Sequence, residues 1–136
     1  MEYIFHVFGH PNIKATHVKT LEFSKDQDLT ERGDCIIGIR ADFDIEKLKQ
    51  FEKKVRVICE VTDEKGEVIR SEFKCKVNPQ FADAHELVLR KSGFLSDRTF
   101  GLGLNRGANH LDRRIVELLK DPNQVMVVTI KSGWAD

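Results

Sequence analysis

Two histidines near the N-terminus have side chains suited to metal binding or acid–base chemistry. His10 and His17 flank a segment that opens with Gly9 and Pro11, which favour a turn. Neutral imidazoles bind divalent metals, and they exchange protons near neutral pH. The spacing matches no established metal motif. A divalent metal held by His10 and His17 is therefore one hypothesis, and two ordinary hydrogen-bonding histidines are the alternative.

Asp34 and Cys35 form a second group of candidate catalytic residues. They follow Gly33 at the expected entry to a strand. A thiolate beside a histidine base acts as a nucleophile, and the Asp34 carboxylate could orient that base or add a ligand to a metal site. The alternative is structural, because a free cysteine in a strand usually behaves as a small apolar side chain.

Positive charge is concentrated between residues 90 and 114. Six Lys and Arg residues oppose Asp97 and Asp112 there, leaving a net charge of +4 in a chain whose total is zero. This asymmetry indicates an anionic partner. Phe94 and Phe100 lie among the cations, where they would either stack on unpaired bases or belong to the core. The candidate RNA-binding residues are Arg90, Lys91, Ser92, Phe94, Asp97, Arg98, Thr99 and Arg106.

Three glycines, Gly101, Gly103 and Gly107, precede an expected helix. Backbone amides before a helix often bind phosphate, and Arg106 would add a positive charge. The spacing differs from the known nucleotide-binding fingerprints. For this segment, a strand that places Phe100 and its alternate neighbours on one face is the favoured alternative. For the positive charge of residues 90–114, the alternative to an anionic partner is that Phe94 and Phe100 belong to the core and Arg113 pairs with Glu117 on the helix.

The elements that must position these residues are mostly strands. Residues 55–61 and 68–75 alternate between apolar and polar side chains, and Gly66 suits the left-handed position of the turn between them. If Asp63 faces Glu67, one register gives an apolar face and a mostly charged face. Further strands are expected over residues 3–8, 16–23, 35–40, 85–90, 99–104 and 124–130, the last of them central in the sheet.

Two helices are expected, over residues 44–54 and 109–120. Asp44 and Asn109 are suitable N-cap residues, and apolar residues recur with helical spacing behind each. Strands in succession with two inserted helices predict an α+β fold, with a mainly antiparallel sheet or a partly closed β-barrel.

Length and composition predict a single globular domain over residues 1–136. The chain is 40% hydrophobic and 32% charged, a profile typical of folded proteins. It contains no apolar run long enough to cross a bilayer and no apolar leader. We therefore expect a cytoplasmic protein with no membrane partner, and the three widely spaced cysteines agree with a reducing compartment.

Three sequence blocks, residues 9–17, 29–36 and 90–99, carry a family resemblance. The chain resembles an uncharacterised, mainly archaeal family, domain of unknown function 371. The resemblance implies an archaeal-type cytoplasmic protein and brings no activity with it. The residues that match the blocks are His10, His17, Asp34, Cys35, Arg90, Lys91, Ser92, Asp97, Arg98 and Thr99.

Three functions are compatible with these patterns. The leading hypothesis is a module that binds RNA or a ribosomal particle, with Arg90, Lys91 and Arg98 on phosphates and Phe94 stacking. The second is a small metal-assisted hydrolase acting on a phosphorylated substrate, with His10 and His17 in its site. The third is a structural homo-oligomer, for example a homodimer, joined by a large apolar patch.

Overall fold

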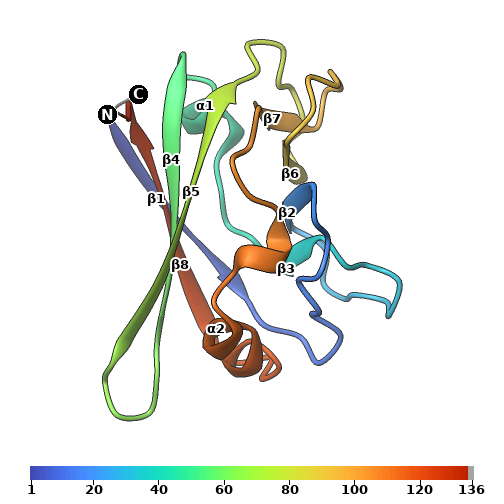
Figure 1. The fold of residues 1–136 in the computed structure, drawn as a ribbon, viewed down its shortest axis with the longest axis vertical. Helices are drawn as coiled ribbons and strands as arrows, with labels where there is room; N and C mark the ends of the chain where they lie inside the picture. The colour runs from blue at the N-terminus through green and yellow to red at the C-terminus, as the bar shows by residue number, and fades with distance from the viewer. Residues whose placement is uncertain (135–136) are drawn as a thin grey trace.

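Strands make up most of the fold, with two short α-helices and one 3-10 helix between them. The computed structural model describes residues 1–134 (Figure 1). The elements are β1 (Glu2–Phe8), β2 (Thr20–Ser24), β3 (Ile36–Gly38), α1 (Ile45–Leu48), β4 (Lys54–Thr62), β5 (Val68–Val77), β6 (Glu86–Arg90), β7 (Thr99–Leu102), η1 (Ala108–His110), α2 (Arg113–Leu118) and β8 (Val125–Ser132).

All the strands belong to one curled sheet. Their order is β1-β8-β4-β5-β7-β6-β2-β3. Within the described residues, β2 pairs with β3 and β6 with β7 in parallel, and the other neighbours are antiparallel. One antiparallel bridge, Phe8 to Ile39, joins an edge strand to the residue after the other edge strand. The predicted α+β class with a mainly antiparallel sheet is confirmed, and over residues 1–134 no strand ladder closes the sheet.

The β4–β5 hairpin has the predicted register. Val57 lies opposite Phe73, and Glu60 lies opposite Arg70. The amide of Asp63 donates to the carbonyl of Glu67, and Gly66 has a φ of 83°. This left-handed conformation favours glycine because it has no Cβ. Alternation in the sequence was sufficient here because both strands are local and half-buried.

Both predicted helices are much shorter than expected. Asp44 caps α1 by accepting from the amide of Glu46, but the helix ends at Leu48, and Lys53 takes a φ of 62° before β4 begins. The second region is split. Asp112 caps α2 through the amide of Arg114, and the 3-10 turn η1 precedes it without a side-chain cap. The prediction of Asn109 as the N-cap is therefore wrong.

The core fills the space inside the curled sheet. Phe5 packs edge-to-face against Phe23 and Phe43, with ring centroids 5.5 and 5.6 Å apart. In Figure 1, α1 and α2 lie near opposite ends of the space between β1-β8-β4-β5 and the remaining strands. Neither helix in the described part of the chain has the length and apolar character that crossing a membrane requires.

Candidate functional site

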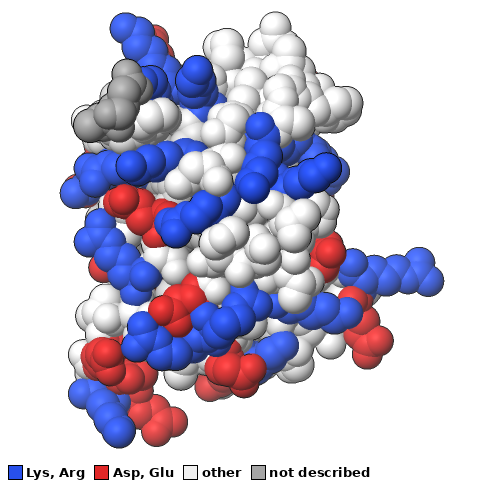
Figure 2. Space-filling view, viewed as in Figure 1, with Lys and Arg blue, Asp and Glu red and all other residues white. Residues whose placement is uncertain are grey.

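Six cationic side chains from five segments lie on neighbouring strands and loops of one face (Figure 2). We call this set the basic strip. Lys19 and Lys91 are exposed, and the other members are half-buried. The strip consists of Lys19, Arg56, Lys74, Arg90, Lys91 and Arg106.

Backbone hydrogen bonds bring these segments together. The amide of Lys91 donates to the carbonyl of Lys19, and Thr20 lies opposite Arg90 in the β2–β6 ladder. At the other end of the strip, the Asn105 side chain accepts from the Lys74 amide, 2.8 Å away. Figure 2 shows Lys and Arg side chains crossing the middle of this face, over β5 and the loop that follows β7.

The arginines of the basic segment do not all contribute to the strip. Arg98 donates to Glu86 at 2.9 Å, and this bond raises the pKa of its guanidinium. Arg114 forms ion pairs with Asp112 at 2.9 Å and with Glu67 at 3.7 Å. The charges of these two arginines are therefore compensated by neighbouring carboxylates.

Arg113 has a structural role. Its guanidinium donates to the carbonyls of Lys14, Ala15, Ala108 and Leu111. These bonds tie α2 to the N-terminal loop. Glu117 is not among these partners, so the predicted helical ion pair does not describe the role of Arg113.

Within the strip, the Arg106 side chain is anchored by its own contacts. It donates to the carbonyl of Glu72, and its guanidinium lies 5.6 Å from the centroid of the Phe73 ring. Its Nε is buried and has no hydrogen-bond partner within the described residues. The guanidinium is therefore held in place by one hydrogen bond and one ring.

The two phenylalanines of the basic segment differ completely in environment. Phe100 is fully buried, which places it in the core, whereas the Phe94 side chain is 62% exposed. The guanidinium of Arg90 lies 5.3 Å from the centroid of the Phe94 ring. Arg90 is itself held by a 3.0 Å hydrogen bond from its Nε to Thr99, whose hydroxyl lies 2.7 Å from that of Ser96.

The other two candidates of this loop form mainly backbone contacts. The Ser92 hydroxyl accepts from the Phe94 amide at 3.3 Å, which stabilises the loop. Asp97 is exposed, and its carbonyl accepts from the amide of Ala82. Both residues lie close to Phe94 in the chain, so they shape the loop that presents the ring.

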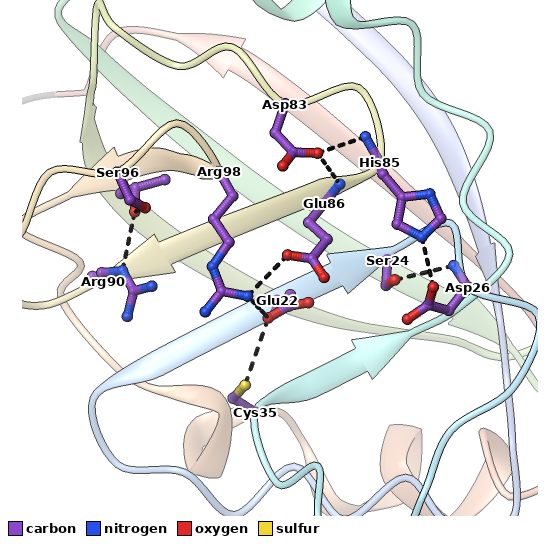
Figure 3. A network of polar contacts seen from close by, with 11 residues as sticks. Glu22, Ser24, Asp26, Cys35, Asp83, His85, Glu86, Arg90, Ser96 and Arg98 are labelled. Atoms are coloured by element: carbon purple, nitrogen blue, oxygen red, sulfur yellow. Dashed lines mark hydrogen bonds and ion pairs between the residues drawn. The ribbon is translucent and has the colours of Figure 1, made fainter.

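A second polar group lies on the outer side of β2 and β6. Glu22, only 5% exposed, lies 4.0 Å from Arg98 and 3.9 Å from the thiol of Cys35 (Figure 3). Burial raises the pKa of the Glu22 carboxyl to about 7, and the nearby charge of Glu86 adds to this effect. Local sequence gave no sign of this environment, because Glu22 alternates with the buried Leu21 as an outward-facing strand residue does.

A neighbouring pair was also missed from the sequence. His85 Nε2 lies 2.6 Å from Asp26, and the amide of Asp26 donates to Ser24. His85 and Asp26 are 59 positions apart, so only the pairing of β2 with β6 brings them together. Figure 3 shows this pair beside the Glu22 group.

Cys35 and Asp34 are brought to different surroundings. Burial, with smaller contributions from the charges of Glu22 and Asp34, raises the pKa of the Cys35 thiol to about 11. A thiol with this pKa is a poor nucleophile at neutral pH. The carbonyl of Asp34 accepts from the amides of Thr16 and His17, so its backbone fixes the N-terminal loop.

The two histidines of that loop are engaged in hydrogen bonds. His10 Nε2 lies 2.6 Å from Asp28, and its Nδ1 accepts from the Asn12 amide. His17 Nδ1 accepts from the amides of Lys19 and Thr20. These bonds turn the chain, so β2 begins at Thr20 rather than at the predicted residue 16. Among residues 1–134, no three His, Cys, Asp or Glu side chains are grouped to hold a metal ion.

Packing explains Gly101 and Gly107, whereas Gly103 has a φ of 61° and an added Cβ there would meet no atom within 4 Å. A Cβ at Gly101 would lie 2.5 Å from the Cys75 sulfur, and one at Gly107 would lie 2.4 Å from the Val18 carbonyl. Gly101 belongs to β7, which confirms the interpretation of this segment as a strand. Gly101 and Gly107 allow close contacts between segments of the chain.

Fold and surface together define a small α+β protein with a curled, mainly antiparallel sheet and a basic strip on one face. The chain belongs to the family described as Domain of unknown function (DUF371), whose model matches residues 5–132. It is similar to an uncharacterized protein of Methanocaldococcus jannaschii, with 36% identity over 134 residues, or 93% of this chain and 96% of that protein. The resemblance found in the three sequence blocks is therefore confirmed, and this relative is archaeal.

Proposed function

We propose that the protein binds RNA, free or within a ribonucleoprotein, through the basic strip. The observation that carries the proposal is the gathering of cations on one face of a chain with zero net charge. They come from β4, β5, the end of β6, and the loops that precede β2 and follow β7. Phosphates attract such a surface and release their counterions on binding. Within residues 1–134, the one ion pair of a strip residue joins Arg56 to Glu72, at 3.5 Å.

Anchoring of the strip supports this proposal. Arg90 and Arg106 are fixed by hydrogen bonds and by aromatic rings, so binding would cost them little conformational freedom. Lys19 and Lys91 are exposed and can follow a flexible backbone. Arg98, held by Glu86, is expected to contribute less than Lys91.

A metal-assisted hydrolase has less support than RNA binding. His10 is occupied at both ring nitrogens, and the Cys35 thiol has a raised pKa. An oligomeric scaffold also has less support, since exposed apolar side chains such as Ile4 and Val68 belong to strands at different positions in the sheet.

The test is binding of a fluorescent single-stranded RNA oligonucleotide across a salt series. We expect the affinity to fall steeply with salt. Changing Lys74→Gln together with Lys91→Gln removes two phosphate contacts, so the slope of log affinity against log salt should decrease by about 1.4, at ~0.7 per contact.

The matched control is the double variant Lys47→Gln and Lys65→Gln. It removes the same charge from α1 and from the hairpin turn, away from the strip. The proposal is overturned if the unmodified protein does not bind RNA at low salt, or if both double variants lose the same affinity.

A further inference from the structure

We infer that the bound RNA is unpaired where it meets the end of the basic strip, and that one of its bases stacks on Phe94. This inference rests on the proposed function. It specifies the class of RNA and assigns the contact that would distinguish a single strand from a duplex.

The exposure of Phe94 is the first observation. The chain has nine phenylalanines, and within residues 1–134 only Phe94 is exposed, the others being buried or half-buried. Leu95 beside it is 53% exposed. An apolar pair at the surface gains nothing from burial in the free protein, whereas contact with a ligand would remove it from water.

The fixed geometry around the ring is the second observation. The guanidinium of Arg90 lies over the ring, and a hydrogen bond to Thr99, whose hydroxyl in turn contacts that of Ser96, holds Arg90 in place. The cation occupies one side of the ring and the residue as a whole is 62% exposed, so a stacked base would lie on the other side of the ring. An exposed aromatic ring beside a fixed positive charge fits a base and its adjacent phosphate.

Position in the strip is the third observation. Lys91 follows Arg90 directly and is hydrogen-bonded through its backbone to Lys19. If an RNA single strand stacks one base on Phe94, its neighbouring phosphates would therefore lie close to these cations. In an A-form duplex the bases are stacked and paired, so their faces are not available to Phe94.

The experiment compares three probes of equal length, a single-stranded RNA, its duplex and a single-stranded DNA, with the unmodified protein, Phe94→Leu and Phe94→Tyr. We expect tighter binding of single strands than of the duplex. Phe94→Leu should weaken single-strand binding about 5- to 100-fold, the range of one stacked base, and should leave duplex binding unchanged. Phe94→Tyr keeps the ring and should retain the affinity.

An internal probe separates occupation of the strip from stacking. Trp134 is the one tryptophan of the chain, and its ring lies 5.8 Å from the ammonium group of Lys74. Saturating RNA should quench Trp134 fluorescence in both the unmodified protein and Phe94→Leu. Thermal unfolding of Phe94→Leu should match that of the unmodified protein because the side chain is at the surface.

The possible results distinguish the two proposals. Equal affinity for duplex and single strand would overturn the stacking inference and leave RNA binding intact. The same holds if Phe94→Leu binds the single strand as well as the unmodified protein does, which would point to a protein partner for Phe94 and Leu95. Absence of all binding would overturn both proposals. Equal single-stranded RNA and DNA affinities would show that recognition ignores the 2′-hydroxyl.

Discussion

At the scale of single residues, the Glu22 carboxyl links stability to pH. Its pKa is about 7 in the folded protein and 4.5 in an ordinary environment. Between these values the folded state holds a proton that the unfolded state has lost, so stability falls as pH rises from about 4.5 to about 7. The full effect is about 3 kcal/mol.

Glu22→Gln tests this assignment because the amide cannot ionise. We expect urea unfolding at pH 8 to show that the variant is more stable than the unmodified protein, by up to about 3 kcal/mol, and at pH 5 to show little difference. Comparing the two proteins cancels the contribution of the histidines. Parallel pH profiles would show that Glu22 ionises normally.

Cys35 offers a second prediction at this scale. Its pKa rises from 9.0 to about 11, so at neutral pH its thiolate fraction, and with it the rate of alkylation, should be about 100-fold lower than in an unfolded chain. Cys59 and Cys75 are buried, so they should react only on unfolding. Iodoacetamide labelling followed by mass spectrometry measures all three rates. Rapid, selective labelling of native Cys35 would restore it as a candidate nucleophile.

From the sequence, candidate residues could be recognised by their type, but the environment that sets their chemistry could not be predicted. Cys35 stood out by its type, yet its environment depends on Glu22, 13 positions earlier. Glu22 itself gave no signal because an acidic residue that alternates with apolar ones normally faces water. The contacts that bury Glu22 come from strands that are distant in the chain but paired in the sheet, so the neighbouring sequence does not predict them.

At the scale of elements, Arg113 fastens α2 to the N-terminal loop. The carbonyl of Ala15 accepts from it at 2.8 Å, and Ala15 is fully buried with a φ of 51°. Arg113→Ala leaves this carbonyl without its charged partner. We expect a loss of about 1–3 kcal/mol in the free energy of unfolding.

Arg114→Ala is the matched control for Arg113. Arg114 occupies the next position of the same helix, and its side chain is 63% exposed. Its ion pairs are screened by solvent, so the change should have little effect on chemical denaturation. Equal losses for the two variants would mean that Arg113 acts only as a helix residue.

Gly101 tests the packing interpretation of the glycine run. A methyl group there would meet the Cys75 sulfur at 2.5 Å and Leu89 at 2.8 Å, so Gly101→Ala should cost about 1–3 kcal/mol in thermal or urea unfolding. Gly93→Ala is the control, because no atom lies within 4 Å of the added carbon. It should leave stability unchanged or slightly raised. A harmless Gly101→Ala would remove close packing as the reason for this glycine.

The register of one hairpin could be predicted from the sequence, whereas the lengths of the two helices could not. The β4–β5 register was predictable because a shift of one residue would turn the apolar face of one strand toward solvent. The helices were not, because over about twelve residues the periods of a 3-10 turn and an α-helix are difficult to distinguish. Leu111, extended at ψ 130°, interrupts the second region, and its neighbours in the chain gave no indication of this break.

At the scale of the whole molecule, the curl of the sheet decides which residues share a surface. The parallel pairings of β2 with β3 and of β6 with β7 connect segments whose contact no local pattern specifies. The sequence predicted a basic region between residues 90 and 114, but the fold divides it. Arg98 is paired with Glu86, whereas Lys19 and Lys74 arrive from elsewhere to complete the strip.

Zero net charge and a local basic strip make opposite predictions for binding to a polyanion column. At 0.1 M salt the Debye length is about 10 Å, shorter than the radius of gyration of about 14 Å expected at this chain length. Acidic side chains on the far side therefore cannot cancel the field at the strip.

We expect the protein to be retained on heparin although its pI is about 7.0. The double variant Lys74→Gln and Lys91→Gln should elute at clearly lower salt, and the double variant Lys47→Gln and Lys65→Gln should elute with the unmodified protein. Because both variants carry the same net charge, identical elution would show that no single face governs the interaction.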